Sequence, residues 1–468
     1  MTAIALPLDA HPMRRQRLPA PVPHETPPGR LALLMGLRKN PVATWSRVHY
    51  ELPVVQGPGI LGYLTVLNAP EGVRRLFLDN AANYPKDDLQ QRILSPGLGD
   101  GLLTAEGDAW RQQRRTLAPL FTPRKIASFT GQMQEGSDRL VARMLRRGEG
   151  GTVDVMEEMT RVTFDILSST LFSGTIAGDA DAFGRAMTRY FSTQGRIDPL
   201  DLMGAPDWLP RIGRILARPA IQYFQKQMQE TMRRRRAQID AGGAPPPDIL
   251  TALLEAADPE TGKGLTEAEI GANITTFIGA GHETTANTLT WALYLLSRAP
   301  DIRDRVEQEA DAVFEGGRSV AEWPDAMPMT RAVIEETMRL YPAASTLSRK
   351  ALEEDTLAGY TIPKGSLVIV SPWLLHRHKS LWTDPELFVP ERFLPDNREK
   401  IERFAYLPFG AGPRICIGMG FAMQEMAIVL AHILHRMRLT YGTDGVPEPV
   451  QRITLKPDGG MPMRLERR

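Results

Sequence analysis

The segment from Thr266 to Ser297 constrains the fold most, because it has the pattern of one long helix. Thr266 followed three residues later by Glu269 forms a capping box, which is typical of a helix start. At 1.5 Å per residue this helix would be roughly 48 Å long and would cross the whole protein. Its centre, Gly279–Thr285, contains two glycines and a pair of threonines, which weaken a helix. We therefore expect a local distortion of the helix there.

Most of the remaining chain also has a helical pattern. Segments with helical periodicity cover residues 107–121, 124–147, 156–174, 217–241, 327–341 and 417–437. Short strand-like segments lie near residues 52–56, 62–67, 344–351 and 366–370, and at the C-terminal end. The chain shows no regular alternation of strands and helices and no repeat. The sequence therefore predicts a mainly α fold with a small β subdomain.

Two further stretches mark the organisation of the chain. Residues 1–30 are rich in proline, and we expect an N-terminal arm that is poorly ordered or lies on the surface. Residues 241–247 resemble a linker and follow four arginines, Arg233–Arg236. We interpret these arginines as the solvated end of a helix rather than as a docking patch. The formal net charge of +1 gives no reason to expect nucleic acid or an anionic membrane as partner.

Cys416 is the only cysteine among 468 residues. A single thiol excludes an intrachain disulfide and any zinc or iron–sulfur site built from several thiolates. It is consistent with a reducing compartment. The most apolar stretches, such as 367–375 and 426–434, are far shorter than the ~20 residues of a membrane span. Because no export segment is visible either, we expect a cytoplasmic protein.

The surroundings of Cys416 give the strongest functional signal. It lies in the decapeptide Phe409-Gly-Ala-Gly-Pro-Arg-Ile-Cys-Ile-Gly418, at the start of the apolar helical segment 417–437. The glycines allow close backbone approach and unusual dihedral angles. The free N–H groups at a helix start favour a thiolate. Such a thiolate suits an axial ligand of iron, and the alternative is a glycine-rich turn that holds an inert buried cysteine.

This decapeptide resembles the haem-binding signature of the cytochrome P450 family, Phe-Gly-x-Gly-x-Arg-x-Cys-x-Gly, at every specified position. Further motifs of that family lie in the same order along the chain. They are Trp110-Arg-Gln-Gln-Arg114, Ala280-Gly-His-Glu-Thr284, Glu336-Thr-Met-Arg339 and Phe388-Val-Pro-Glu-Arg-Phe393. The resemblance implies a triangular, mostly helical fold, with haem b (iron protoporphyrin IX) between the long central helix and the cysteine loop. It also implies a single catalytic domain over residues 31–468.

The resemblance further implies which residues hold the haem. Cys416 would be the axial ligand of the iron. The loop around it would include Phe409, Gly410 and Gly418. The haem propionates would be bound by Trp110, Arg114, Arg349 and Arg414. For Arg349 the alternative is a solvent-facing position on a strand edge, since its neighbour Lys350 could be confused with it.

Two other motifs receive different roles by the same resemblance. Thr284 would hold a water or donate a hydrogen bond in the distal pocket, and Glu283 would relay protons from solvent. For both, the alternative is an ordinary polar helix surface. We expect His282 to be structural or solvent-facing.

The Glu336–Arg339 pair could be a surface ion pair of little consequence. The resemblance implies instead a buried triad with Arg392, which braces the chain below the haem and takes no part in catalysis. We assign no chemistry to His376 or His378, because neither has metal-site spacing with other ligands.

The resemblance implies a haem-thiolate monooxygenase that inserts one oxygen atom from O2 into an apolar small molecule, by hydroxylation or epoxidation. The alternatives are a peroxide-driven peroxygenase and a non-catalytic haem sensor or carrier. With one cysteine and no flavin-binding segment, we expect electrons from a separate protein, either a ferredoxin with its reductase or a flavodoxin. We expect a monomer without a membrane anchor. The substrate does not follow from the sequence.

Two surfaces complete these expectations. The walls of the substrate pocket would be Asp87–Leu103, residues 185–205, Thr276–Ala280 and Ala343–Leu347. The redox partner would dock near the cysteine loop on Arg111 and Arg115. These two residues are four apart and share one helix face. The alternative is that both arginines are merely solvated.

Overall fold

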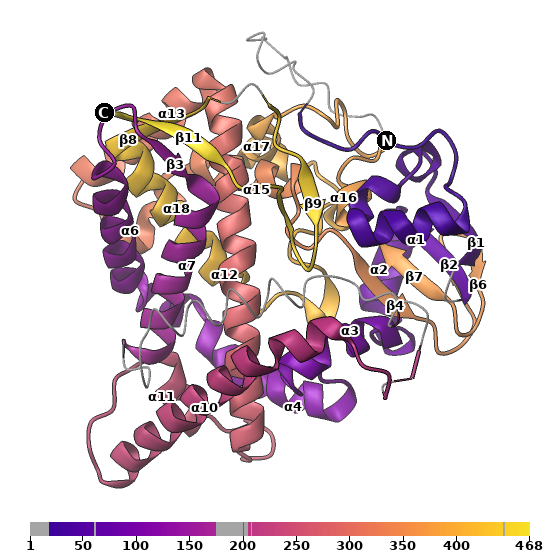
Figure 1. The fold of residues 1–468 in the computed structure, drawn as a ribbon, viewed down its shortest axis with the longest axis horizontal. Coiled ribbons are helices and arrows are strands. Elements are labelled where there is room, and N and C mark those ends of the chain that lie inside the picture. Colours follow the sequence, from indigo (N-terminus) through magenta and orange to yellow (C-terminus); the bar gives the residue numbers. More distant parts are fainter. Residues whose placement is uncertain (1–17, 60–61, 175–199, 201–204, 207, 443–444) are drawn as a thin grey trace.

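The computed structural model describes residues 18–59, 62–174, 200, 205–206, 208–442 and 445–468. Helices form most of the molecule, and the largest sheet lies on the side that holds the N-terminal part of the chain (Figure 1). The helices are α1 (Arg30–Lys39), α2 (Pro70–Arg74), α3 (Asp88–Leu98), α4 (Gly107–Leu117), α5 (Pro123–Ala127), α6 (Thr130–Leu145), α7 (Val155–Phe172), α10 (Ile212–Asp240), α11 (Ile249–Glu255), α12 (Glu267–Arg298), α13 (Pro300–Glu315), α14 (Trp323–Ala326), α15 (Pro328–Leu340), α16 (Pro372–Leu375), α17 (Pro395–Arg398) and α18 (Met419–Arg436). This confirms the predicted mainly α fold.

The strands form small sheets rather than one large one. The four-stranded sheet has the order β1 (Val54–Gly59), β2 (Gly62–Leu67), β7 (Leu367–Val370) and β4 (Leu347–Lys350). In this sheet β2 and β7 are parallel and the other pairs are antiparallel. The remaining strands are β3 (Thr152–Asp154), β11 (Pro462–Arg467) and β8 (Met437–Tyr441) in one sheet, and the pairs β9 (Pro449–Gln451) with β10 (Leu455–Pro457) and β5 (Asp355–Leu357) with β6 (Tyr360–Ile362).

Helix α12 crosses the molecule (Figure 1) and begins where its capping box predicts. The Thr266 hydroxyl accepts a hydrogen bond from the Glu269 amide at 3.3 Å, and the Glu269 carboxylate accepts one from the Thr266 amide at 2.8 Å. The expected distortion is wrong, because the helix continues without a break through Gly279–Thr285. Most of its side chains are buried, so tertiary packing outweighs the weak local propensity.

Gly281 has a packing role in this helix. A Cβ atom at this position would lie 3.3 Å from the Leu167 side chain of α7. The glycine therefore lets α7 and α12 approach closely, and it accounts for part of the unusual composition at the centre of α12.

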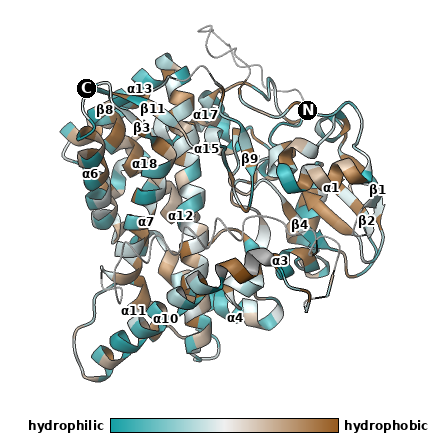
Figure 2. Ribbon diagram, viewed as in Figure 1, coloured by the Kyte–Doolittle hydropathy of each residue, from teal (hydrophilic) through white to brown (hydrophobic). Residues whose placement is uncertain are grey.

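The core is formed by amphipathic helices packed around α12 and α18. In α6 the buried residues Met133, Ser137, Leu140 and Met144 repeat at intervals of three and four, which places them on one face. Figure 2 shows teal, hydrophilic residues along this outer helix. The apolar stretch of α18 is buried in the core. Among the described residues, we find no helix with the length and apolar character of a membrane span.

The described part of the proline-rich arm lies against the body of the protein. The Tyr341 hydroxyl donates a hydrogen bond to the Pro19 carbonyl at 3.1 Å, and the His24 amide donates one to the Trp45 carbonyl at 3.0 Å. Residues 1–17 of the arm lie outside the described residues.

The break at residues 241–247 connects α10 to α11, as predicted, but the interpretation of the preceding arginines is wrong in part. Arg235 is buried, and its guanidinium lies 2.6 Å from the Asp248 carboxylate. Asp248 also caps α11 by accepting a hydrogen bond from the Thr251 amide at 2.9 Å. Arg235 therefore fastens the end of α10 to the start of α11, whereas Arg233 and Arg234 pair with Glu230 at the surface.

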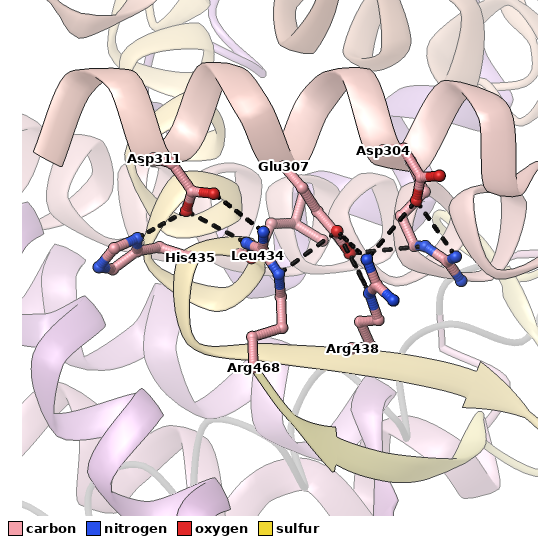
Figure 3. Close-up of polar contacts among 8 residues, drawn as sticks. Asp304, Glu307, Asp311, Leu434, His435, Arg438 and Arg468 are labelled. Atoms are coloured by element: carbon pink, nitrogen blue, oxygen red, sulfur yellow. Dashed lines mark hydrogen bonds and ion pairs between the residues drawn. The ribbon is translucent and has the colours of Figure 1, made fainter. Parts of the chain in front are cut away.

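A cluster of ion pairs fixes the C-terminal sheet to α13 (Figure 3). Arg438 of β8 pairs with Glu307 at 2.7 Å, and Arg468 pairs with Asp311 at 2.9 Å. Glu307 and Asp311 are four residues apart and lie on one face of α13. Figure 3 shows that His435 also points to Asp311 from the end of α18. The cluster joins α13 to the adjacent elements α18 and β8 and to the C-terminal residue, which are more than 100 residues further along the chain.

Candidate active site

Cys416 lies in the loop between the short helix η10 (Gly412–Arg414) and α18. Its amide donates a hydrogen bond to the Phe409 carbonyl at 2.9 Å, which closes the decapeptide into a turn. The side chain of Cys416 is exposed. The thiol therefore has an open side, and the alternative of an inert core cysteine does not hold.

Three effects determine the pKa of the Cys416 thiol. The protein that surrounds the open side of the thiol raises the pKa by desolvation, and this effect is the largest. A hydrogen bond from the Gly418 backbone and the positive charge of Arg114 both lower the pKa. The loop thus supplies an N–H group and a cation, both of which stabilise a thiolate ligand.

Gly412 is the glycine that the loop requires most. Its φ is +69°, and a Cβ atom here would lie only 1.8 Å from the carbonyl oxygen of Phe77. Phe77 belongs to the π-helical turn η4 (Arg75–Asp79), which packs directly on the loop. A side chain at position 412 would both strain the backbone and displace η4.

Arg414 and Trp110 are brought together beside this loop, as the resemblance implies. The centre of the Arg414 guanidinium lies 4.3 Å from the centre of the Trp110 ring, in a cation–π contact. Arg414 also pairs with Glu106 and donates a hydrogen bond to the Ala105 carbonyl at 3.2 Å. Glu106 directly precedes α4, which carries both Trp110 and Arg114.

Arg349 lies on β4 and is 9% exposed, so the alternative of a solvent-facing residue is wrong. Its guanidinium packs over the ring of Phe77 at 5.0 Å and donates one hydrogen bond, to the Ser348 carbonyl at 2.7 Å. Burial, and then the nearby charge of Arg414, lower the pKa of Arg349 to about 10. Lys350 is the exposed neighbour, and it pairs with Asp88 at 2.8 Å.

Lys86 belongs to the same cluster, and the sequence reasoning missed it. Its side chain is 6% exposed, lies 3.8 Å from the Glu106 carboxylate and donates a hydrogen bond to the Leu103 carbonyl. Burial, and then the charge of Arg414, lower the pKa of Lys86 to about 7. The available signal was its position directly before the predicted pocket wall Asp87–Leu103.

The charges around the cysteine loop do not balance. The cations are Lys86, Arg114, Arg349 and Arg414, and the neighbouring carboxylates are Asp87 and Glu106. Among the described residues, no hydrogen bond or ion pair is formed by the Arg114 side chain, although its charge acts on Cys416. A partly buried surplus of positive charge is costly unless an anion binds. A ligand with two carboxylates, such as haem, fits this surplus.

Thr284 and Glu283 lie near the middle of α12. The Thr284 hydroxyl donates a hydrogen bond to the Ala280 carbonyl at 2.6 Å, and the Glu283 carboxylate lies 3.7 Å from the Lys456 ammonium. His282 is buried, and its Nδ1 lies 2.7 Å from the Ile278 carbonyl, which agrees with a structural role. Within the described part of the chain, no hydrogen bond or ion pair joins Thr284 or Glu283 to Cys416.

The Glu336–Arg339 pair is fully buried and is not a surface ion pair. All five N–H groups of the Arg339 guanidinium donate hydrogen bonds, two of them to the Glu336 carboxylate at 2.7 and 2.8 Å. The other three donate to the carbonyls of His376, Pro385 and Leu387. Arg392 of η8 (Pro390–Phe393) lies 3.5 Å from Glu336, so the implied triad is formed. His376 and His378 are both buried and form hydrogen bonds that fit structural positions.

Two of the predicted pocket walls are in contact. The Leu102 amide donates a hydrogen bond to the Asn273 side chain at 2.8 Å, and a Cβ atom at Gly101 would lie 2.7 Å from the Thr276 hydroxyl. The Thr276 hydroxyl is buried and has no hydrogen-bond partner in the structure. The wall predicted at 185–205 lies almost entirely outside the described residues. A separate cleft of about 650 Å³ lies elsewhere, and its lining includes Arg74, His378, Trp382 and Phe404.

The expected docking pair on α4 is not free. Arg115 binds the buried Asp258 carboxylate through two hydrogen bonds of 2.9 and 2.8 Å, and it also pairs with Glu260 at 3.2 Å. Arg111 is exposed and pairs with Asp108. Both arginines are therefore paired within the chain, Arg111 in the more exposed pair, and the docking site stays a prediction.

Comparisons with known proteins give the family of this chain. The family model for cytochrome P450 matches residues 61–462. A cyclooctat-9-en-7-ol 5-monooxygenase of Streptomyces melanosporofaciens is 34% identical, over 88% of this chain and 89% of its own. An ultra-long-chain fatty acid omega-hydroxylase of Homo sapiens is 31% identical, over 90% of this chain and 82% of its own. The crystal structure of the cytochrome P450DA haem domain superposes with a TM-score of 0.82 at 26% identity, and covers 97% of this chain and 99% of its own.

The fold and the cysteine loop define a haem-thiolate protein, and the comparisons give its family. The chain belongs to the cytochrome P450 family and is a P450 monooxygenase, an oxidoreductase that uses O2.

Proposed function

We propose that this protein inserts one oxygen atom from O2 into a C–H bond or an alkene of an apolar small molecule. The other oxygen atom leaves as water, and each turnover consumes two electrons and two protons. Haem b, when bound through a thiolate, supplies the activation of oxygen. The observation that carries the proposal is the surplus of cations around the open side of the cysteine loop.

The proposal assigns the haem contacts to this chain's own residues. Cys416 Sγ holds the iron, with the Gly418 amide and Arg114 stabilising the thiolate. The propionates bind to the cluster of Trp110, Arg114, Arg349 and Arg414, to which we add Lys86. Arg349 has open N–H groups, and a guanidinium suits a carboxylate in a bidentate geometry. Phe409 and Gly410 shape the turn that presents the sulfur.

Two residues of α12 are assigned to proton delivery. Thr284 Oγ1 holds a water or donates a hydrogen bond on the side of the pocket, and Glu283 moves protons from solvent through its carboxylate. This acid–alcohol pair favours a monooxygenase over its rivals. A peroxide-driven peroxygenase receives its protons with the oxidant, and a haem sensor or carrier needs no proton path.

Electrons come from a separate redox protein, either a ferredoxin with its reductase or a flavodoxin. Exposed Arg111 lies on the helix that also carries Arg114, so it is the remaining candidate for a rim contact with an acidic partner. We propose that the protein acts as a monomer in the cytoplasm, where its single thiol stays reduced.

We assign an apolar substrate class, because the names of the two relatives give cyclooctat-9-en-7-ol and ultra-long-chain fatty acids as their substrates. A spectral screen for a low- to high-spin shift should therefore contain cyclooctat-9-en-7-ol, dodecanoic acid and polycyclic aromatic compounds. The compound with the largest shift then serves as substrate.

The test of the proposed function is the Thr284→Ala variant with NAD(P)H, a ferredoxin and its reductase. Its product yield per NAD(P)H should fall roughly tenfold or more, and hydrogen peroxide should replace the missing product. Thr290→Ala is the matched control, since Thr290 forms the same type of bond to the Ala286 carbonyl at 2.7 Å. A full product yield in Thr284→Ala would contradict the role assigned to Thr284. A parent protein that reduces no oxygen would contradict the proposed monooxygenase activity.

A further inference from the structure

The hairpin of β9 and β10 lies against α12 where Glu283 is located. Glu283 and Asn287 are four residues apart and share one face of α12. The Glu283 carboxylate lies 3.7 Å from the Lys456 ammonium, and the Asn287 side chain donates a hydrogen bond to the Thr454 hydroxyl at 3.0 Å. On the hairpin, Thr454 lies in the bend directly before β10, and Lys456 lies within β10.

The spacing of these two contacts matches. Four residues of an α-helix rise about 6 Å, a distance that the two residues from Thr454 to Lys456 can span. Helix and hairpin therefore meet in register at two points, one neutral and one charged. In the part of the chain that the structure describes, Lys456 is the one cation within ion-pair distance of Glu283.

The hairpin is fixed on its other sides, so the position of Lys456 is determined by the fold. The Leu455 amide donates a hydrogen bond to the Ala343 carbonyl at 2.9 Å, at the start of the predicted pocket wall Ala343–Leu347. Asn40 bonds to the Pro449 carbonyl at 3.0 Å and to the Gln451 amide at 3.1 Å. Leu455 is fully buried beside Lys456, which anchors the strand.

Both members of the ion pair are partly open to water. The Lys456 side chain is 31% exposed and that of Glu283 is 17% exposed. An acid that moves protons between solvent and a buried site needs this kind of position, and a fixed cation beside it restricts its rotamers.

We propose that Lys456 is a positioning residue for Glu283, which holds the carboxylate in the orientation from which it delivers protons. The inference rests on the proposed function, because it specifies how the acid of that site is held. Lys456 touches neither the substrate nor the haem in this account, and it acts through Glu283.

Zero-length cross-linking with a water-soluble carbodiimide tests the geometry in the haem-loaded enzyme, without any turnover. We expect a linked peptide pair that contains Glu283 and Lys456, and we expect it to be absent in Glu283→Gln and in Lys456→Arg. Absence of this pair in the parent protein would overturn the positioning contact, whatever the enzyme's activity.

Turnover tests the consequence, with cyclooctat-9-en-7-ol or dodecanoic acid, whichever gives the larger spin shift. We define the coupled fraction as the fraction of consumed oxygen that is not released as hydrogen peroxide. Lys456→Met should lower this fraction roughly five- to tenfold. The loss is smaller than the ~100-fold that removal of a general acid can cost. Lys456→Arg should restore the coupled fraction, because the charge is kept. In the Glu283→Gln background, Lys456→Met should have no further effect.

Arg452→Met is the matched control, because this cation of the same hairpin bonds to the Lys39 carbonyl at 2.6 Å and not to α12. It should behave like the parent protein. Equal peroxide release by Lys456→Met and the parent, or additive losses with Glu283→Gln, would overturn the proposal. The peroxide share can be measured without substrate, so a parent that reduces oxygen but forms no product contradicts the proposed function and not the role of Lys456.

Discussion

Two buried charged networks of this protein differ in how completely the chain satisfies them. In the triad of Glu336, Arg339 and Arg392, the Arg339 guanidinium fills every N–H group with a carboxylate or carbonyl of the chain. In the cluster beside the cysteine loop, Arg349 forms one hydrogen bond, and cations outnumber the neighbouring carboxylates. Arg339 is therefore fully paired within the chain, although the buried Nε of Arg392, 3.5 Å from Glu336, has no hydrogen-bond partner. We propose that an anionic ligand supplies the acceptors that the second network lacks.

This difference distinguishes structural from binding residues of the same chemical type. A buried guanidinium without enough acceptors costs free energy, and we propose that a bound ligand supplies the acceptors that Arg349 lacks. The comparison predicts that variants of the triad change folding, whereas variants of the open cluster change haem binding.

Loss of one partner of the triad should have the largest effect on stability. Glu336→Gln leaves Arg339 buried without its carboxylate, and we expect a loss of roughly 3–5 kcal/mol in the free energy of unfolding. Denaturant unfolding measures it. The control is Glu353→Gln, which removes an exposed carboxylate from its pair with Lys364 and should cost under ~1 kcal/mol. Equal stability of the two variants would mean that the triad does not brace the fold.

Replacing the buried Lys86 should have the opposite effect in haem-free protein, because it should increase the free energy of unfolding. Its folded pKa is about 7 and its ordinary value is 10.5, so the unfolded state binds more protons between these pH values. The free energy of unfolding should therefore rise with pH across this window, and Lys86→Met should remove that rise and stabilise the protein at pH 7 by on the order of 3 kcal/mol. Haem should dissociate faster from the same variant.

Destabilisation of haem-free Lys86→Met at pH 7, with the pH dependence unchanged, would contradict this account. In that case Lys86 would be satisfied within the chain, as Arg339 is.

Arg349 should have a smaller effect, confined to haem affinity. Arg349→Lys keeps the charge but loses the planar guanidinium, so we expect haem affinity to fall roughly tenfold, measured by transfer to an apo-globin acceptor. Lys350→Gln is the matched control, because that neighbour is exposed and pairs with Asp88. If Lys350→Gln released haem as readily as Arg349→Lys, the assignment of the strand residue would be reversed.

The ion-pair cluster on α13 should have the smallest effect, because the buried Glu307 carboxylate keeps Arg303 and Arg468 as partners when Arg438 is replaced. Arg438 is 40% exposed where it pairs with Glu307 (Figure 3), so Arg438→Gln should cost about 1 kcal/mol or less at low salt. The cost should shrink in 1 M salt, which screens exposed charges. A larger, salt-independent loss would show that this cluster behaves like the buried triad.

The parts of the protein that follow from local sequence were predicted, and those that depend on distant contacts were not. The start of α12 follows from a capping box four residues long, and the turn around Cys416 follows from the decapeptide. The partner of Arg115 lies 143 residues away, so the sequence could not show that this arginine is neutralised. The expected distortion of α12 failed because burial along the helix outweighs its local propensity.

The cation cluster lies between these two cases. The motif residues Trp110, Arg114 and Arg414 were found by resemblance, because they belong to two short motifs with fixed spacing. Lys86 was missed, because only the fold brings it beside Glu106, which is 20 residues further along the chain. The surplus of charge that identifies the site is therefore visible in the structure and not in the sequence.

The central claim is that Cys416 provides the axial thiolate of the haem. The most direct test is the absorption spectrum of the reduced protein with carbon monoxide. The parent protein should absorb at the position typical of thiolate-ligated haem, and Cys416→His should absorb at the position typical of histidine ligation while haem stays bound. A parent spectrum of the histidine type, or an unchanged spectrum in Cys416→His, would contradict the claim.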